Sequence, residues 1–439
     1  MTRRLAVAII SESGQILARR NTCGFVLPEV DVAHDRDGIA IFRAVREQLN
    51  LKIFCLVYPQ SDQPRFLRLQ SFASPVPDDL VWVEAADLHS FSELPVDRIR
   101  AATDDFGGFS WYSKAIVWLE DRVNRLGYEL KGLEQWNGRV GGVLLRVITT
   151  GPELWFKAVN EFNTREFQIA QMLAGRHPRY FPQVVGSEVS LNGLLLEHIA
   201  GVELHDCCDI DDWKAATTAL ADVQMDWMGS EERLLQAGAA DLRAETMASE
   251  LPAFLDHVDA AMARQPRTPP AALTRADLEN MSPGLYRLTN RASALQLRPG
   301  LTNADFSPHN TLLTDAGPRF IDWAEACVSL PLIAGEYLWN RMAIECPERI
   351  EWQSSLRDIY LHRWAERYGM ERIQRAAEIL PTFAILAAAM FLHERECNGP
   401  SVYDAYLRSL ARRLQRELKR TDSAGPLPVF AGGFAGCVT

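Results

Sequence analysis

The pattern of apolar residues changes sharply along the second part of this 439-residue chain. Between residues 130 and 205, short apolar runs such as "VGGVLLRVITT" and "ELWFKAV" alternate with glycine-containing turns, which is typical of strands. Beyond residue 210 the runs lengthen and take helical spacing. One of them places four apolar side chains on a single helix face: Trp213, Leu220, Val223 and Trp227. We therefore expect a small β-rich lobe (130–205) followed by a helical lobe (206–420).

The first hundred residues have a different order of predicted elements. Residues 3–10 and 15–20 flank the turn-forming "SESG", which predicts a hairpin. A helix is predicted over 38–51 from the spacing of four apolar residues: Ile39, Phe42, Val45 and Leu49. Strand-like runs follow at 53–59, 65–72 and 80–88. The expected segments are a small α/β domain (1–105), a linker with a short helix (106–129) and a mobile tail (421–439).

The charge and the cysteine pattern exclude several classes of function. A net charge of −11 gives no general attraction to polyphosphate or to an anionic membrane, so neither nucleic acid nor a membrane is expected as a partner. The eight cysteines are scattered and form no CxxC pair, which disfavours a zinc site. These features favour a cytoplasmic protein with reduced cysteines.

Two apolar stretches resemble targeting or membrane segments but are too short for those roles. The run after Arg4 extends over about six residues before Ser11, whereas a signal peptide needs roughly 7–15. It is better interpreted as a strand. Residues 379–393 contain Pro381 and fall short of the ~20 residues of a membrane span. We expect a buried helix there.

Three polar residues in "LTNADFSPHNTLL" and "PRFIDWAEA" have a spacing that suits phosphate chemistry. Asp305 and Asn310 form D-x4-N, and Asp322 ends an apolar strand further on. Phosphoryl transfer needs a carboxylate to orient the attacking hydroxyl, and oxygen ligands to hold Mg²⁺ against the phosphates. Asp305 suits the first task, and Asn310 and Asp322 suit the second. The alternative is that Asp305 and Asn310 are turn residues and "FIDW" is an ordinary strand.

This segment resembles the catalytic and metal-binding loops of the aminoglycoside phosphotransferase and choline kinase superfamily, written H-x-D-x4-N and I-D-W/F/Y. Asn303 stands at the His position, and Ala304 stands where Gly is common. That His mainly supports the loop, so its replacement leaves the base and the metal ligands in place. The resemblance covers about residues 130–400. It implies a two-lobed protein-kinase-like fold that binds ATP and Mg²⁺ between its lobes.

The β-rich lobe supplies further matches to that family. Lys157 interrupts the apolar strand "ELWFKAV", where an amine is costly unless it meets anions such as the α- and β-phosphates of ATP. The resemblance implies that Glu166 pairs with Lys157. The alternatives are a Lys157 on the solvent face and an exposed Glu166. A phosphate-covering loop or a plain hairpin is expected at Gly138, Gly141 and Gly142. The resemblance also implies that adenine meets the backbone of Glu197, His198 and Ile199.

Substrate contacts are expected in the helical lobe. Asp241 and Arg243 are candidates, although an ordinary surface helix start explains them as well. Near the C-terminus, leucines at 407, 410, 414 and 418 predict a helix. Its other side carries Arg412, Arg413, Arg416, Lys419 and Arg420. We interpret that side as a solvated face; a phosphate or partner site is the alternative.

The N-terminal segment resembles a Nudix domain, because "FRAVREQLNL" aligns with the R-E-U-x-E-E-x-G-U part of that family's signature. Four positions match: Arg43, Val45, Glu47 and Leu51. Ala44 and Gln48 replace acidic metal ligands, and Asn50 replaces Gly. Upstream, Glu29 stands at the signature's Gly position and Asp35 at its Glu position. Since hydrolysis needs several carboxylates around the metal, the resemblance implies a hydrolase relic in which Glu47 is a solvated helix residue.

Together these features predict an α+β protein: a degenerate Nudix-like α/β sandwich followed by a bilobal kinase-like domain. The expected activity is ATP- and Mg²⁺-dependent phosphoryl transfer to a hydroxyl of a polar small molecule. One rival is a pseudokinase that binds nucleotide without turnover. Another places a nucleotide-diphosphate binder or hydrolase in the N-terminal domain. The sequence indicates neither the acceptor nor the oligomeric state.

Overall fold

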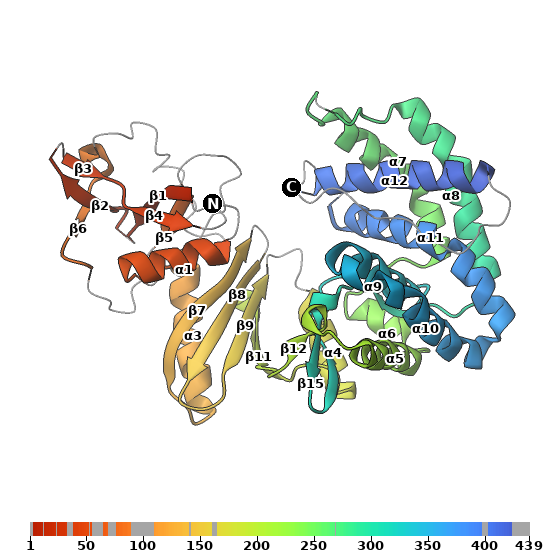
Figure 1. Ribbon diagram of the computed structural model, residues 1–439, viewed down its shortest axis with the longest axis horizontal. Helices are drawn as coiled ribbons and strands as arrows, with labels where there is room; N and C mark the ends of the chain where they lie inside the picture. Colours follow the sequence, from red (N-terminus) through yellow and green to blue (C-terminus); the bar gives the residue numbers. More distant parts are fainter. Residues whose placement is uncertain are drawn as a thin grey trace. The chain divides into compact units, whose positions relative to one another are not determined.

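A computed structural model describes most of the chain (Figure 1). The described residues are 3–11, 13–22, 24–32, 38–51, 53–54, 65–68, 76–88, 109–139, 142–159, 165–267, 269–396 and 403–423. They fall into two compact units. The first comprises Met1–Phe167 and Gln183–His198, and the second comprises Gln168–Pro182 and Ile199–Thr439. The predicted α+β class is confirmed.

In the described part of its first hundred residues, the first unit has a mixed sheet of six short strands and the helix α1. Its strands are β1 (Arg3–Ile10), β2 (Ile16–Asn21), β3 (Gly24–Val26), β4 (Glu29–Val32), β5 (Arg65–Arg68) and β6 (Leu80–Val83). The predicted hairpin is present as β1 and β2, with Ile9 opposite Leu17. β5 runs parallel to β1, and β6 pairs with β2. β3 and β4 were not predicted, and most of the strand expected at 53–59 lies outside the described residues.

The predicted helix is α1 (Gly38–Leu49), and it is fixed to β4 by one side chain. Val45 and Leu49 are buried against the sheet. Gln48 Oε1 accepts the Asp31 N–H at 2.9 Å, and Gln48 Nε2 donates to the Asp31 carbonyl at 2.8 Å. The side chain at a position where the Nudix signature has a metal ligand therefore joins helix to strand. Glu47 is exposed, and the side chains of Ile39 and Phe42 lie outside the described residues.

The rest of the first unit is a five-stranded antiparallel sheet covered by a long helix. The strand order is β10-β11-β9-β8-β7. Its strands are β7 (Leu130–Arg139), β8 (Gly142–Thr149), β9 (Leu154–Val159), β10 (Val184–Glu188) and β11 (Gly193–Glu197). Of these, β10 was not predicted.

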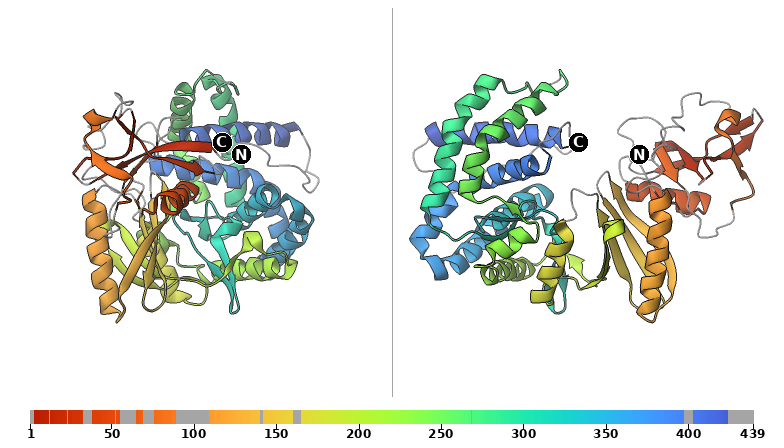
Figure 2. Two further views of the ribbon diagram at one scale, coloured as in Figure 1. Left: turned by 60° about the vertical axis from the view of Figure 1, so that its left-hand side comes forward. Right: turned by 180° about the vertical axis from the view of Figure 1, so that it is seen from behind.

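Helix α3 (Phe109–Arg125) belongs to this sheet. Its apolar side chains at 115, 119 and 123 are fully buried in one cluster with Leu145 and Phe156 of the sheet. Figure 2 shows the helix lying along the sheet. The helix expected in this segment is present, but it is longer than the predicted short helix, and its apolar face packs into the core on one side of the sheet.

The second unit is mainly helical, as predicted. Its helices after α4 (Arg165–Arg176) are α5 (Ile210–Asp226), α6 (Glu231–Gln236), α7 (Ala244–Ala263), α8 (Arg275–Ala294), α9 (Ile333–Glu345), α10 (Gln353–Tyr368), α11 (Met370–Glu396) and α12 (Asp404–Ser423). Two small sheets accompany them. One joins β12 (Val202–Glu203), β15 (Thr311–Thr314) and β16 (Gly317–Phe320), and the other joins β13 (Ala240–Asp241), β17 (Ala326–Ser329) and β14 (Gly300–Asn303).

Helix α11 is the apolar segment that was expected to be a buried helix. It continues through Pro381 and is longer than expected, because a proline whose neighbours supply the packing is tolerated inside a helix. Over Met370–Arg395 it is long and apolar enough to cross a membrane, but 89% of its most apolar window is buried inside the protein. Such burial is typical of a core helix, which is what the sequence predicted.

The C-terminal helix α12 buries the predicted leucine stripe at 407, 410, 414 and 418. Its basic side is less solvated than expected. Arg412 donates to the Ala271 carbonyl at 3.1 Å, and Arg413 is partly buried, whereas Arg416 and Lys419 are exposed. Only part of the predicted solvated face is therefore open to water.

Candidate active site

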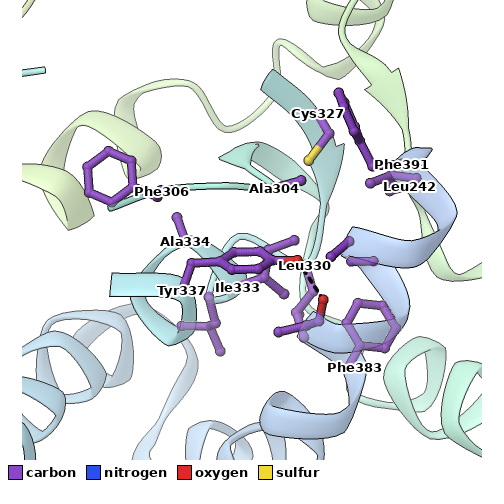
Figure 3. Close-up of a cluster of buried hydrophobic side chains, with 14 of the residues drawn as sticks. Leu242, Ala304, Phe306, Cys327, Leu330, Ile333, Ala334, Tyr337, Phe383 and Phe391 are labelled. Atoms are coloured by element: carbon purple, nitrogen blue, oxygen red, sulfur yellow. Dashed lines mark hydrogen bonds between the residues drawn. The ribbon is translucent and has the colours of Figure 1, made fainter. Parts of the chain in front are cut away.

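The loop that carries Asp305 lies between β14 and β15 on a packed apolar base. Figure 3 shows Ala304 and Phe306 of this loop together with Ile333 and Ala334 of α9, in a cluster that also contains Tyr337. Ala304 and Phe306 are almost completely buried. The Tyr337 hydroxyl donates to the Ala384 carbonyl at 2.6 Å, which ties α9 to α11. The loop backbone is therefore held from below by apolar packing.

Asn303 connects the two loops of the predicted site. It is completely buried at the end of β14, opposite Ala326 of β17. Its Oδ1 accepts the Asp305 N–H at 2.8 Å, and its Nδ2 donates to the Asp322 carbonyl at 3.1 Å. One amide thus fixes both carboxylate-bearing loops, using its acceptor for one and its donor for the other. Asn303 therefore joins the two loops through its side chain.

Asn310 and Asp322 are adjacent in space. The Ile321 N–H donates to the Asn310 carbonyl at 2.9 Å, and the Asn310 amide nitrogen donates to the Asp305 carbonyl at 3.3 Å. Because its nitrogen is engaged, the Asn310 side chain can offer only its oxygen to a cation. Asp322 follows β16 with φ of +57°, a left-handed conformation that is uncommon outside glycine and ends the strand abruptly.

This oxygen-only pair fits Mg²⁺, which binds few protein ligands and keeps several waters. No cluster of three or more His, Cys, Asp or Glu suited to a metal occurs among the described residues. A site made of Asn310 and Asp322 would therefore need water and phosphate oxygens to complete the coordination shell. That requirement matches a metal that binds together with a nucleotide.

Asp305 is 47% exposed and forms an ion pair that the sequence did not predict. Arg341 of α9 places Nη2 2.8 Å from Asp305 Oδ1, and its Nη1 lies 3.5 Å from Glu345 Oε1. Burial acts to lower the pKa of Arg341, but the Asp305 carboxylate outweighs it and the pKa lies above the usual value. Because Arg341 lies 36 residues from Asp305 and belongs to no motif, only the fold reveals it.

The predicted pair of Lys157 and Glu166 is present in the first unit. Lys157 Nζ lies 2.5 Å from Glu166 Oε1, joining β9 to the first turn of α4. The side chains are 22% and 4% exposed. The alternative of an exposed Glu166 is therefore wrong. A partly buried ion pair of this kind holds the ammonium group in a fixed position, which is what a phosphate contact requires.

The glycine-rich segment forms the turn end of the β7–β8 hairpin. Gly138 pairs with Val143 and Arg139 with Gly142, while Gly141 lies outside the described residues. A Cβ on Gly142 would meet the Ala158 carbonyl at 3.4 Å, so this position packs closely on β9. Both interpretations of the segment, a phosphate-covering loop and a plain hairpin, stay open.

Two N–H groups of the backbone segment that was expected to contact adenine already donate hydrogen bonds within the protein. The Glu197 N–H donates to the Gln183 carbonyl at 3.0 Å, and the His198 N–H donates to the Glu153 carbonyl at 3.3 Å. Trp155 Nε1 donates to His198 Nδ1 at 2.9 Å. The N–H groups of Glu197 and His198 are therefore used within the first unit, and the contact of this backbone with adenine stays a prediction. Ile199 is the remaining candidate donor of the three.

Asp241 and Arg243 bind each other. The guanidinium donates from Nε at 2.9 Å and from Nη2 at 2.6 Å to the two carboxylate oxygens, and the Arg243 N–H donates to Asp241 Oδ1 at 3.1 Å. Burial acts to raise the pKa of Asp241, but these bonds outweigh it and the pKa lies below its usual value. This closed pair at the start of α7 favours a helix-start role over substrate contact.

No protein-family model and no curated protein sequence matches the chain. Several solved structures are similar to part of the chain. A Plasmodium vivax ethanolamine kinase has a TM-score of 0.48 at 10% identity, over 65% of this chain and 82% of that one. A choline kinase from Streptococcus pneumoniae has a TM-score of 0.48 at 13% identity, over 70% and 99%. A macrolide 2′-phosphotransferase from Brachybacterium faecium has a TM-score of 0.42 at 13% identity, over 68% and 97%.

Proposed function

We propose that this chain is a cytoplasmic phosphotransferase that uses ATP and Mg²⁺ to phosphorylate a hydroxyl of a polar small molecule. The observation that supports it most is the Asn303 link, because one buried amide holds the Asp305 loop and the Asp322 loop together. A buried side chain that is hydrogen-bonded to both loops would hold the Asp305 carboxylate in place beside the two oxygen ligands, Asn310 and Asp322. Phosphoryl transfer depends on such positioning more than on covalent chemistry by the protein.

Each residue has a defined task in this proposal. Arg341 engages Oδ1 of Asp305, so Oδ2 is the oxygen that would orient the acceptor hydroxyl and accept its proton. Asn310 and Asp322 would hold Mg²⁺, which neutralises phosphate charge during transfer. Lys157, kept in place by Glu166, would contact the nucleotide phosphates.

The first test is magnesium-dependent stabilisation of the protein by ATP. Ligand binding raises stability by RT ln(1 + [L]/Kd), about 2.7 kcal/mol at a hundredfold excess over Kd. Lys157→Ala and Asp322→Asn should each reduce the thermal shift, whereas Asp315→Asn, an exposed carboxylate on the β15–β16 turn, should leave it unchanged. Equal shifts in the parent and the Lys157 variant would remove Lys157 from the nucleotide site.

A second candidate is a nucleotide-binding protein without turnover, and the Asp305–Arg341 ion pair favours it, because a carboxylate held by a guanidinium is less free to accept a proton. The two candidates differ in phosphate transfer. A phosphotransferase should lose transfer by orders of magnitude on Asp305→Asn while still binding ATP. A parent protein that binds magnesium–ATP and phosphorylates nothing in a broad metabolite panel would establish the second candidate.

A further inference from the structure

The guanidinium of Arg341 is shared between two carboxylates of the second unit. Its Nη2 lies 2.8 Å from Asp305 Oδ1, and its Nη1 lies 3.5 Å from Glu345 Oε1. Arg341 and Glu345 are four residues apart on α9, so their side chains lie on the same helix face. A planar guanidinium that is bound on two sides has little freedom to turn. The position of Asp305 Oδ1 therefore depends on how Arg341 is held.

Glu345 also lies beside the loop that carries Asp305. Its Oε2 is 3.9 Å from Nε2 of His309, which belongs to the D-x4-N segment. His309 is itself held in place. Its Nδ1 lies 2.5 Å from Glu203 Oε2, and its ring stacks on that of His205 with centres 4.3 Å apart. Glu345 thus meets the Asp305 loop at two places, by way of the guanidinium and at the imidazole.

Helix stability does not account for a glutamate at this position. Glu345 is the last residue of α9, where the negative end of the helix dipole disfavours a carboxylate. An arginine followed four residues later by a glutamate is also the less favourable order for such a pair on a helix. In the described part of the chain, Glu345 Oε2 is buried and has no hydrogen-bond partner, which is a further cost. A carboxylate placed at this cost to stability indicates a role in the neighbouring site.

We propose, on the basis of the function proposed above, that Arg341 and Glu345 are positioning residues for phosphoryl transfer. Glu345 holds the guanidinium, and Arg341 holds Asp305 Oδ1, so that Oδ2 is presented to the acceptor hydroxyl. In the reaction the hydroxyl oxygen forms a bond to the γ-phosphorus of ATP. The bond from that phosphorus to the β,γ-bridging oxygen breaks, ADP leaves, and the hydroxyl proton passes to Oδ2. The ion pair between Asp305 and Arg341 therefore aligns the carboxylate and does not block it.

The test measures ADP formation from magnesium–ATP by the full chain. The acceptors are water alone and a broad metabolite panel that includes glycerol, glucose, ethanolamine and choline. Arg341→Gln should lower kcat with the best acceptor by about 10- to 100-fold, the scale on which a misplaced catalytic group slows a reaction. Arg341→Lys should restore part of the rate, since an ammonium group can still bind Oδ1. KM for ATP should stay at the parent value, because neither positioning residue is a ligand of the metal or the phosphates.

A double-mutant cycle tests whether Glu345 acts through Arg341. Glu345→Gln keeps the shape of the side chain but removes its charge, and it should lower kcat less than Arg341→Gln does. In the Arg341→Gln background the same change should have no further effect, because the guanidinium that Glu345 holds is absent. The matched controls are Glu351→Gln and Arg375→Gln, two exposed residues of the same unit, which should leave kcat unchanged. All rates are compared at a temperature at which thermal unfolding shows each variant to be folded.

Three results would overturn this inference while the proposed function stands. They are an Arg341→Gln rate that equals or exceeds the parent rate, a Glu345→Gln rate equal to that of the Glu351→Gln control, and additive effects of the two substitutions on kcat. The first would make the ion pair a block or a purely structural contact. A parent that binds magnesium–ATP but forms ADP with neither water nor any compound of the panel would instead overturn the proposed function, and this inference with it.

Discussion

Asn303 shows how one residue can fix the geometry of a candidate site. Its side chain is completely buried and satisfied at both ends, by the Asp305 N–H and by the Asp322 carbonyl. The sequence marks this position as a departure from the motif that the segment resembles. An asparagine can join the two loops because it offers one donor and one acceptor.

This role can be tested with two variants of Asn303. Asn303→Ala removes the hydrogen bonds to a partly buried N–H and a partly buried carbonyl, so we expect a loss of about 0.5–1.5 kcal/mol in unfolding free energy for each bond. Asn303→Asp keeps the acceptor for Asp305 but loses the donor to Asp322. Denaturant unfolding measures the stability, and transfer assays measure the rate.

The transfer rate should fall in both Asn303 variants, even under conditions in which they are fully folded. Unchanged transfer in a folded Asn303→Ala protein would show that the amide only stabilises the fold.

The residues that could be predicted from the sequence are those whose chemistry contrasts with that of their neighbours in the chain. Lys157 is recognisable because a lysine inside an apolar strand is costly, and the pair with Glu166 is present. Asp305, Asn310 and Asp322 are recognisable from their spacing. Arg341 is not, since arginines on helices are common and its partner is distant in sequence. The partners of the Glu197 and His198 N–H groups were not predictable, because backbone partners depend on chain pairing, which no single residue reveals.

At the scale of elements, helices α7 and α11 meet through two histidines. His257 and His393 are both 8% exposed, and their Nδ1 atoms lie 3.2 Å apart. Burial lowers the pKa of each imidazole below its ordinary value of 6.5, and for His257 the neighbouring His393 lowers it further. Both rings are therefore neutral in the folded protein at neutral pH, and protonation of either one opposes this packing.

The consequence is a pH-dependent stability of the helical unit. Below pH 6.5 the unfolded chain binds more protons at these positions than the folded chain. The contribution of the two histidines to stability is therefore complete above pH 6.5, and it is lost as the pH falls through their lowered pKa values in the folded protein. Thermal unfolding from pH 7.5 to 5 should show this decline, and His257→Phe combined with His393→Phe should flatten it. His362→Gln, an exposed histidine on α10, is the control, and equal slopes in all three proteins would contradict the prediction.

Elements with strong periodicity were predictable, and short ones were not. The strands β8 and β9 and the helix α5 have clear alternation or helical spacing and are present as expected. Strands β3 and β10 contain three and five residues and lack such a pattern, and β4 alternates over only four residues, so pairing with neighbouring strands decides whether these segments form strands. The long helix α3 was underestimated because its core-facing side is defined by the sheet that it covers.

At the scale of the whole molecule, the N-terminal domain and the five-stranded sheet belong to one unit. Arg46 of α1 lies 2.5 Å from Glu134 of β7, and Phe54 stacks on Tyr112 of α3 with ring centres 4.5 Å apart. The exposed ion pair contributes at most about 1 kcal/mol, so the aromatic contact is the stronger link. This placement is compatible with a structural contribution of the N-terminal domain to the sheet.

We therefore expect no useful hydrolysis of nucleoside diphosphate derivatives by the whole protein. Ala44 is buried and Gln48 is bound to β4, so the helix face of the Nudix signature offers too few carboxylates. Glu47→Gln should change neither phosphate transfer nor any residual hydrolysis measured with magnesium. A metal-dependent hydrolysis that survives Asp305→Asn but disappears in Glu47→Gln would place an active site in the N-terminal domain instead.

The Gln48 contact also limits which side chains this helix position can accept. Replacing Gln48 by glutamate would place an acidic side chain on the exposed side of α1, but a carboxylate cannot donate to the Asp31 carbonyl and would face it with a negative charge. The substitution would thus weaken the joint between helix and strand before any metal could bind there. A side chain that holds the fold makes its own replacement costly, so stability restricts what this position can become.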